Sequence, residues 1–229
     1  MTSFVLKVIA MITMFCDHLG DSMLKGYSNF NLIGRIAFPI FAFQISEGYQ
    51  KTSNLKKYFL RLFIFAIISQ IPYMLVLSLF SDNIYKFNIF FTLFFGLLTI
   101  FVYDKINNFK INKFIKFFYG FTFMLFIGYI AQLLRFDYGF WGIIVIFSFY
   151  LFRNSKLIST ICFLILCVIK YIVQIIINGY DYRYILMCIC TMLPIVFINM
   201  YNKKQGYKIK YFLYLFYPVH LLFLYFIFR

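Results

Sequence analysis

The sequence predicts an all-α integral membrane protein, built as a polytopic bundle of about nine transmembrane helices. Apolar residues make up 64% of the 229 positions and charged residues only 13%, a balance that one soluble hydrophobic core of this size would not hide from water. The apolar residues gather in runs close to the roughly 20 residues that a crossing helix needs. No linker rich in Pro, Gly or Ser divides the chain, so we expect a single domain over residues 1–229.

Seven apolar runs are long enough to cross a bilayer, and two more are doubtful by length. The seven long runs are Phe4–Leu24, Phe30–Tyr49, Tyr58–Phe80, Phe114–Leu134, Leu157–Ile177, Tyr184–Tyr201 and Tyr211–Phe228, and the two short runs are Asn88–Tyr103 and Gly139–Phe152. Prolines 39, 72, 194 and 218 fall inside these runs. Each removes a backbone donor and is expected to kink its helix.

The basic residues predict how the bundle is oriented in a cell (plasma or inner) membrane. If all nine runs cross, fourteen Lys and Arg residues fall on one side and four on the other. Without Gly139–Phe152 as a span the numbers become nine and nine, so we favour nine spans. Loops rich in Lys and Arg usually face the cytoplasm, which places the N-terminus inside and the C-terminus outside. The rich side has Lys51, Lys56, Lys57, Arg61, Lys105, Lys110, Lys113, Lys116, Arg153, Lys156, Lys203, Lys204, Lys208 and Lys210, and the poor side has Lys25, Lys86, Arg135 and Arg183. Orientation therefore explains the net charge of +15 better than a nucleic-acid partner does.

Several ionisable residues lie inside the apolar runs, where they are costly unless they line a polar cavity. Lys7 and His18 are eleven residues apart on the first run, which returns to within about 20° of the same helix face and separates them by about 16 Å along the axis. They therefore share one stripe, with Lys7 at the cytoplasmic mouth. Asp17 points about 100° away from His18, and Asp21 shares the stripe of Asp17.

Each of these residues also has an ordinary structural interpretation. Lys7 can be a lysine that reaches the membrane interface, and His18 a hydrogen-bonded structural histidine. Arg35 needs an acceptor, either Asp17 or Asp21 in an ion pair, or a substrate or oxyanion. Glu47 can pair with a basic neighbour, Lys51 or Arg61.

The last apolar run contains a second candidate site. His220 lies in residues 216–222 (FYPVHLL), near the middle of that run, where a histidine is again costly without a partner. Lys170 can reach outward, pair with a carboxylate or line the cavity, and the sequence leaves these alternatives open. Polar groups such as Gln44 and Gln70 are expected to form hydrogen bonds between helices.

Several sequence blocks resemble one known family, the TraX family. They are residues 6–18 (LKVIAMITMFCDH), 33–43 (IGRIAFPIFAF), 46–49 (SEGY), 58–62 (YFLRL), 69–73 (SQIPY), 88–93 (NIFFTL) and 217–221 (YPVHL). The resemblance implies a polytopic acetyltransferase with an acyltransferase-3-like fold, named for acetylation of conjugative pilin at its N-terminus and related to membrane acyltransferases that modify surface glycans.

What the resemblance implies for the site follows from an arrangement in those acyltransferases, a basic residue followed eleven positions later by histidine. Lys7 and His18 are similar to it. Lys7 would then help to hold acetyl-CoA from the cytoplasm, His18 would act as general base, and Arg35 would stabilise negative charge. The candidate catalytic residues are His18, Asp17 and Arg35, and the candidate substrate-binding residues are Lys7, Glu47, His220 and Tyr217.

The expected function is thus acyl transfer from cytoplasmic acyl-CoA to an amine or hydroxyl acceptor at the outer face. Acetyl-CoA serves as donor and no metal is expected. The expected partners are the lipid bilayer, acyl-CoA and a protein or glycan acceptor, with no nucleic acid. One alternative is a transporter or flippase that uses the same charged cavity for an ion or an anionic lipid, and another is a membrane scaffold for an assembly apparatus. A transporter would favour an inverted repeat, and no clear repeat is present in the sequence.

Overall fold

The computed structural model describes residues 1–24, 29–207 and 210–229. Lys25 and Lys208, which contribute to the charge distribution above, lie outside the described residues. Within those ranges the chain is almost entirely helical, and the β-type pairing is limited to an isolated bridge between Phe87 and Phe136. The predicted all-α fold is confirmed.

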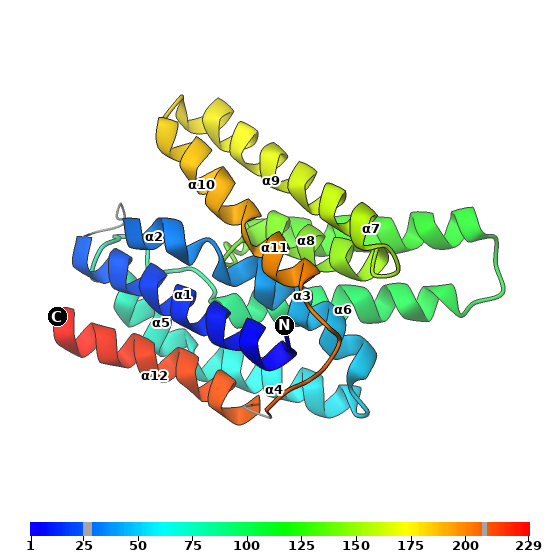
Figure 1. The fold of residues 1–229 in the computed structure, drawn as a ribbon, viewed down its shortest axis with the longest axis horizontal. Helices are drawn as coiled ribbons and strands as arrows, with labels where there is room; N and C mark the ends of the chain where they lie inside the picture. Colours follow the sequence, from blue (N-terminus) through cyan, green and yellow to red (C-terminus); the bar gives the residue numbers. More distant parts are fainter. Residues whose placement is uncertain (25–28, 208–209) are drawn as a thin grey trace.

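Twelve helices are described, and they join end to end into nine helical segments (Figure 1). Three of the segments are broken in two, α2–α3, α4–α5 and α10–α11. The helices are α1 (Ser3–Leu24), α2 (Asn29–Gly34), α3 (Ala37–Lys51), α4 (Leu55–Ile68), α5 (Gln70–Leu77), α6 (Ile89–Asn107), α7 (Lys113–Leu133), α8 (Gly139–Leu151), α9 (Lys156–Asn178), α10 (Tyr182–Met192), α11 (Pro194–Asn199) and α12 (Lys210–Phe228).

Seven of the nine segments are long and apolar enough to cross a membrane. They are α1, α4–α5, α6, α7, α9, α10–α11 and α12, so the chain is a multi-pass membrane protein. The other two are α2–α3, which is interrupted between its two helices, and α8, which has 13 residues. At 1.5 Å per residue, α8 is about 20 Å long, less than the hydrocarbon thickness of roughly 30 Å.

Two of the helix breaks lie where Pro39 and Pro72 predict them. A proline ring collides with the carbonyl of the residue four positions earlier. Pro39 follows Arg35 and Pro72 follows Ile68 at that spacing, and the helix is interrupted after Gly34 and after Ile68. Pro194 is the first residue of α11, and Pro218 lies inside α12 without interrupting that helix.

The loops rich in basic residues meet at one end of the bundle, which we call the basic end. Backbone and side-chain bonds tie them together: the amide of Ser3 donates to Lys204 O at 2.9 Å, and the ammonium of Lys51 donates to Lys203 O at 2.9 Å. Tyr49 and Tyr150 both donate to the carboxylate of Asp104. The loops that carry Phe87 and Asp137 meet at the opposite, far end, joined by a 2.8 Å backbone bond. This distribution agrees with nine passages between the two ends.

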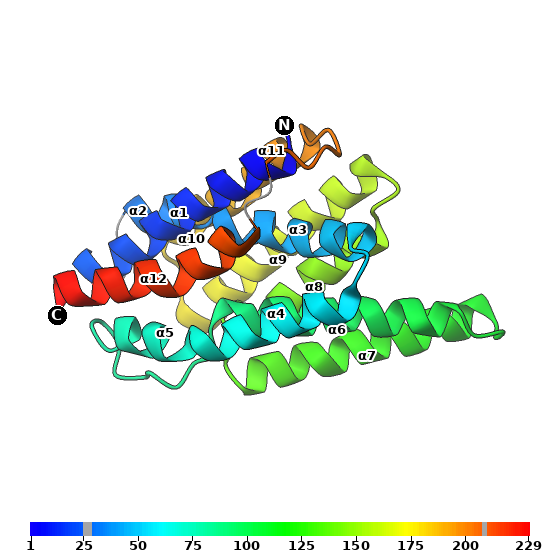
Figure 2. The same ribbon diagram turned by 90° about the horizontal axis from the view of Figure 1, so that it is seen from below.

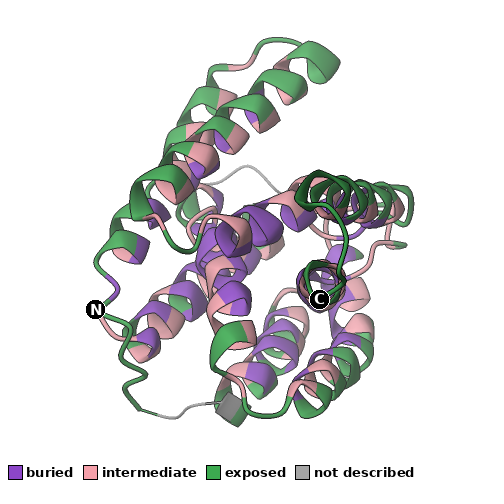
Figure 3. Ribbon diagram, turned by 90° about the vertical axis from the view of Figure 1, so that its right-hand side faces the viewer, coloured by how far each residue is buried: buried purple, intermediate pink, exposed green. Residues whose placement is uncertain are grey.

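Helix α8 is the centre of the bundle, packed by α3, α6, α7 and α9 (Figure 2). Ile143, Val145 and Ile146 on it are fully buried. Gly96 of α6 lets the two helices approach closely, since a Cβ there would lie 2.4 Å from the side chain of Ile146. The doubtful span is therefore a buried core helix that still joins the far end to the basic end. Figure 3 shows the same gradient, with buried residues in the middle and mainly exposed or half-buried ones on α9 and α10.

Candidate functional site

A cavity of about 230 Å³ lies among α1, α3, α4, α6 and α12 and reaches the basic end. Exposed residues such as Lys51 and Gln205 line it there. Towards the middle of the bundle its wall becomes apolar and ends at Tyr217. The polar part of the wall includes Ser3, Lys7, Gln44, Glu47, Thr52, Tyr58 and Arg61, and the apolar part includes Met14, Phe41, Ile89, Phe90, Leu93 and Leu213.

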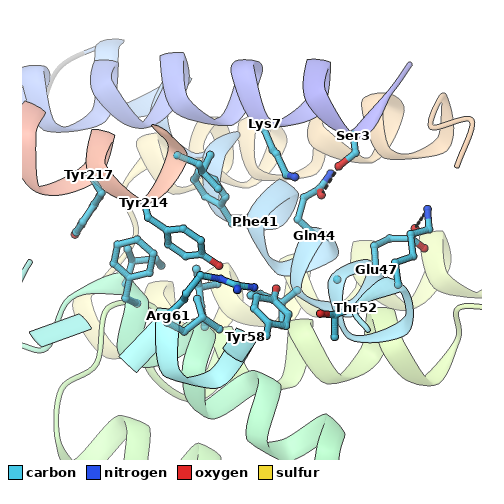
Figure 4. Close-up of a pocket in the computed structure, with 18 of the residues that line it drawn as sticks. Ser3, Lys7, Phe41, Gln44, Glu47, Thr52, Tyr58, Arg61, Tyr214 and Tyr217 are labelled. Carbon is cyan, nitrogen blue, oxygen red and sulfur yellow. Dashed lines mark hydrogen bonds and ion pairs between the residues drawn. The ribbon is translucent and has the colours of Figure 1, made fainter. Parts of the chain in front are cut away.

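Two cations point into the polar half of this cavity. Figure 4 shows Lys7 reaching into it from α1, and Arg61 lying opposite on α4 between Tyr58 and Tyr214. The guanidinium carbon of Arg61 lies 5.8 Å from the centre of the Tyr58 ring. Its Nε is buried and has no hydrogen-bond partner among the described residues. A guanidinium with donor capacity left over suits a phosphate or carboxylate ligand.

Glu47 takes the basic neighbour on its own helix as its partner. Its carboxylate lies 2.9 Å from the ammonium of Lys51, one helical turn away, and that ammonium also donates to the hydroxyl of Tyr201 at 2.6 Å. Of the two alternatives, Lys51 is therefore the partner. Because Glu47 pairs with Lys51, Arg61 is not its partner and lines the cavity instead.

His18 and His220 lie together directly behind the inner end of the cavity. Their ring centres are 5.3 Å apart, and the ring of Tyr217 lies 5.9 Å from the first and 5.6 Å from the second. All three are buried, with exposed fractions of 9%, 4% and 2%. The stripe predicted for α1 thus places Lys7 in the cavity wall and His18 behind Tyr217, so the cavity wall itself does not include His18.

Asp17 and Arg35 form an ion pair on the neighbouring face of α1. Arg35 Nη2 lies 3.4 Å from Asp17 Oδ1, and Arg35 Nε donates to Asn31 O at 3.2 Å. The amide of Asn31 also donates to Asp21 Oδ1 at 2.6 Å. Gly34 permits this close approach of α1 and α2, since a Cβ there would lie 2.3 Å from the side chain of Asp17. Arg35 thus has its acceptor in Asp17, and it does not line the cavity.

Lys170 is held by aromatic rings. Its ammonium lies 4.0 Å from the ring centre of Trp141, 5.0 Å from that of Tyr138 and 5.3 Å from that of Tyr171. Cation–π contacts of this kind stabilise a charge that has left water. These aromatic contacts are a fourth arrangement for Lys170, in addition to reaching outward, pairing with a carboxylate or lining the cavity.

Asp137, in the loop between α7 and α8, adds a carboxylate near these groups. Burial raises the pKa of Asp137 to about 6, and the negative charge of Asp17 acts in the same direction, whereas Arg35 and Lys170 oppose the shift. The charged residues of the far half therefore form one electrostatic cluster. Histidine, cysteine and carboxylate side chains in the described part of the chain form no group of three or more that could hold a metal ion.

The sequence does not single out Arg61 as a cavity residue; it indicates only a charge of the basic side and an alternative partner for Glu47. A signal was available, because Arg61 lies one turn beyond Lys57, inside the apolar part of its run. The pairing of His18 with His220 had no such signal, since it depends on α1 and α12 lying side by side (Figures 1 and 2).

The sequence comparisons match this chain over nearly its whole length. The family model described as TraX protein matches residues 3–228. A curated protein, the probable fimbrial assembly protein FimC, serogroup H1, of Dichelobacter nodosus, is 26% identical over 237 residues, which cover 96% of this chain and 93% of that protein. No solved structure matches the chain. The chain belongs to the TraX family.

Proposed function

We propose that this TraX-family membrane protein is an acyltransferase that takes an acetyl or other acyl group from cytoplasmic acyl-CoA. It gives that group to an amine or hydroxyl acceptor at the outer face, such as a pilin N-terminus or a surface glycan. The observation that carries the proposal is the cavity: cationic at the basic end, apolar further in, and ending at Tyr217 beside two buried histidines. The name of the relative, a probable fimbrial assembly protein, supports a pilus or fimbrial acceptor.

The chemical structure of acyl-CoA matches the change from polar to apolar residues along the cavity wall. Acyl-CoA has a phosphate-rich head and a thin arm that ends in the thioester, so its charged part suits Lys7 and Arg61 and its arm suits the apolar wall formed by residues such as Phe90 and Leu93. From the positive-inside tendency we infer that the basic end faces the cytoplasm, where CoA is found. The pair formed by Glu47 and Lys51 fixes the rim of the mouth.

The chemistry requires a base near the thioester, and His18 is the proposed one. The imidazole takes the proton from the acceptor as its nitrogen or oxygen attacks the thioester carbonyl carbon. The C–S bond then breaks, and CoA leaves as a thiolate towards the basic end. Arg35 lies outside the cavity wall, paired with Asp17, and in this proposal its charge stabilises the oxyanion from behind that wall. Asp17 holds Arg35 in place.

Labelled acetyl-CoA tests the proposal in membranes that contain the protein and its native acceptors. We expect label to enter a surface acceptor with the wild type and with Ile12→Ala, an exposed position on the same helix. We expect none with His18→Gln or Arg35→Ala. Equal labelling in all four samples would contradict acyl transfer by this site. It would leave the two alternatives, a transporter whose charged cavity carries an ion or anionic lipid and a membrane scaffold for an assembly apparatus.

A further inference from the structure

The tautomer of His220 is determined by its own helix. His220 Nδ1 lies 2.7 Å from the backbone oxygen of Phe216. A carbonyl oxygen can only accept a hydrogen bond, so Nδ1 must carry a proton and donate it. In the neutral ring the other nitrogen, Nε2, then presents a lone pair.

That lone pair is buried and unused. His220 Nε2 has no hydrogen-bond partner among the described residues, and the residue is 4% exposed. The ring cannot easily turn away, because it stacks on Phe216 at 4.8 Å between centres and meets the edge of Phe15 at 6.0 Å. A buried acceptor without a partner is unusual in proteins and requires an explanation.

The group best placed to use this acceptor is His18. Its ring centre lies 5.3 Å away on the neighbouring helix α1, with the two rings inclined by 37°. Hydrogen bonds between catalytic groups are often long in the absence of substrate and shorten when it binds. Tyr217 contacts both rings and lines the inner end of the cavity, so the histidine pair adjoins the place where the acyl group would lie.

We propose that His220 is a positioning residue that acts through His18, by accepting a proton at Nε2 from the far nitrogen of that ring. The inference rests on the proposed acyl transfer and deepens it. The hydrogen bond that His220 Nδ1 donates to Phe216 O orients the ring of His220. His220 in turn orients His18 and accepts the proton that His18 gives up. This division resembles the general pattern in which a third group orients a catalytic base.

The proton and the bonds balance in this sequence. The acceptor nitrogen forms a bond to the thioester carbonyl carbon and loses a proton to one nitrogen of His18, while the other nitrogen of His18 gives its proton to His220 Nε2. The C–S bond breaks and CoA leaves with the electron pair as a thiolate. The pair of histidines then returns one proton to that thiolate, which restores both neutral rings.

The test compares two nucleophiles in purified protein with acetyl-CoA as donor and CoA thiol release as readout. Both nucleophiles lose a proton on acylation. Glycinamide needs a base to take that proton, whereas hydroxylamine attacks thioesters readily and its proton, once the N–C bond has formed, is acidic enough to pass to water. For His220→Gln and His220→Phe we expect kcat with glycinamide to fall by about 10²–10⁴-fold. We also expect an unchanged KM for acetyl-CoA and a wild-type rate with hydroxylamine. Val219→Ala, an exposed neighbour on α12, is the matched control and should behave as wild type.

Two outcomes would overturn the role of His220 and leave acyl transfer standing. One is a wild-type kcat with glycinamide in both variants, and the other is an equal loss with both nucleophiles in variants that unfold at the wild-type temperature. A measurement on the unaltered protein is independent of folding defects: the ¹⁵N shifts of the histidines should show His220 protonated at Nδ1, and protonation at Nε2 alone would overturn the inference. Wild-type protein that releases no CoA with either nucleophile would remove both proposals.

Discussion

Replacing Arg61 by Gln is expected to weaken acyl-CoA binding and to leave the chemical step unchanged. Arg61 lies in the polar half of the cavity, with its Nε buried and unpaired among the described residues. The rings that contact the histidine pair come from α1 and α12 and not from its helix α4. The substitution therefore removes the proposed contact to the head of the donor without touching the proposed base.

The size of the effect follows from the kind of bond that is lost. A hydrogen bond to a charged group contributes about 1.5–3 kcal/mol, which corresponds to a Kd for acetyl-CoA that rises by roughly 10- to 150-fold. Because the contact is the same in the ground state and the transition state, KM should rise with kcat unchanged.

Titration calorimetry of the detergent-solubilised protein with acetyl-CoA measures this change. The matched control is Lys57→Gln, which removes one positive charge from an exposed position on the same helix and should bind as the wild type does. Equal affinity of R61Q and wild type would refute the assignment of the cavity to the donor. An equal loss in the control variant would show that only the overall charge of the basic end matters.

Three further predictions concern stability and orientation. Gly34→Leu places a side chain where Asp17 already lies, and this overpacking should lower the free energy of unfolding by about 1–3 kcal/mol; unchanged denaturation in detergent would contradict the close packing of α1 on α2. Asp17→Asn removes the partner of a largely buried Arg35 and should cost roughly 3–5 kcal/mol, whereas the double variant with Arg35→Gln should cost less than the two single losses added together; strict additivity would show that the ion pair contributes nothing. Lys203→Cys should react with an impermeant thiol reagent in inverted membrane vesicles and not in intact cells; the opposite pattern would reverse the assigned orientation.

The helical plan could be predicted from the sequence because it depends on local features. The apolar runs and the prolines determine where segments lie and where they break, as Pro39 and Pro72 illustrate. The role of α8 could not be predicted in the same way. Its 13 residues are short for a span, and the distribution of basic residues, not its length, favours it as one. Only the packing of its neighbours shows that it is the core of the bundle.

The same distinction between local sequence features and tertiary packing decides which parts of the site could be predicted. The common stripe of Lys7 and His18 follows from helix geometry. The ion pair of Asp17 and Arg35 is one of the three alternatives that the sequence leaves open for that arginine, beside Asp21 and a substrate or oxyanion. The contact between His18 and His220 depends on tertiary packing between the first and last helices, which no periodicity encodes. The aromatic surroundings of Lys170 likewise combine residues from a loop and two helices.

The most direct test of the central claim supplies the donor from one side of the membrane only. Proteoliposomes with a known orientation are given labelled acetyl-CoA at the basic end and glycinamide at the far end. We expect labelled acetylglycinamide to form at the far end with the wild type and not with His18→Gln. Product that forms equally when acetyl-CoA is supplied only at the far end, or equally with His18→Gln, would contradict a donor cavity that opens at the basic end and a transfer that depends on His18 as base.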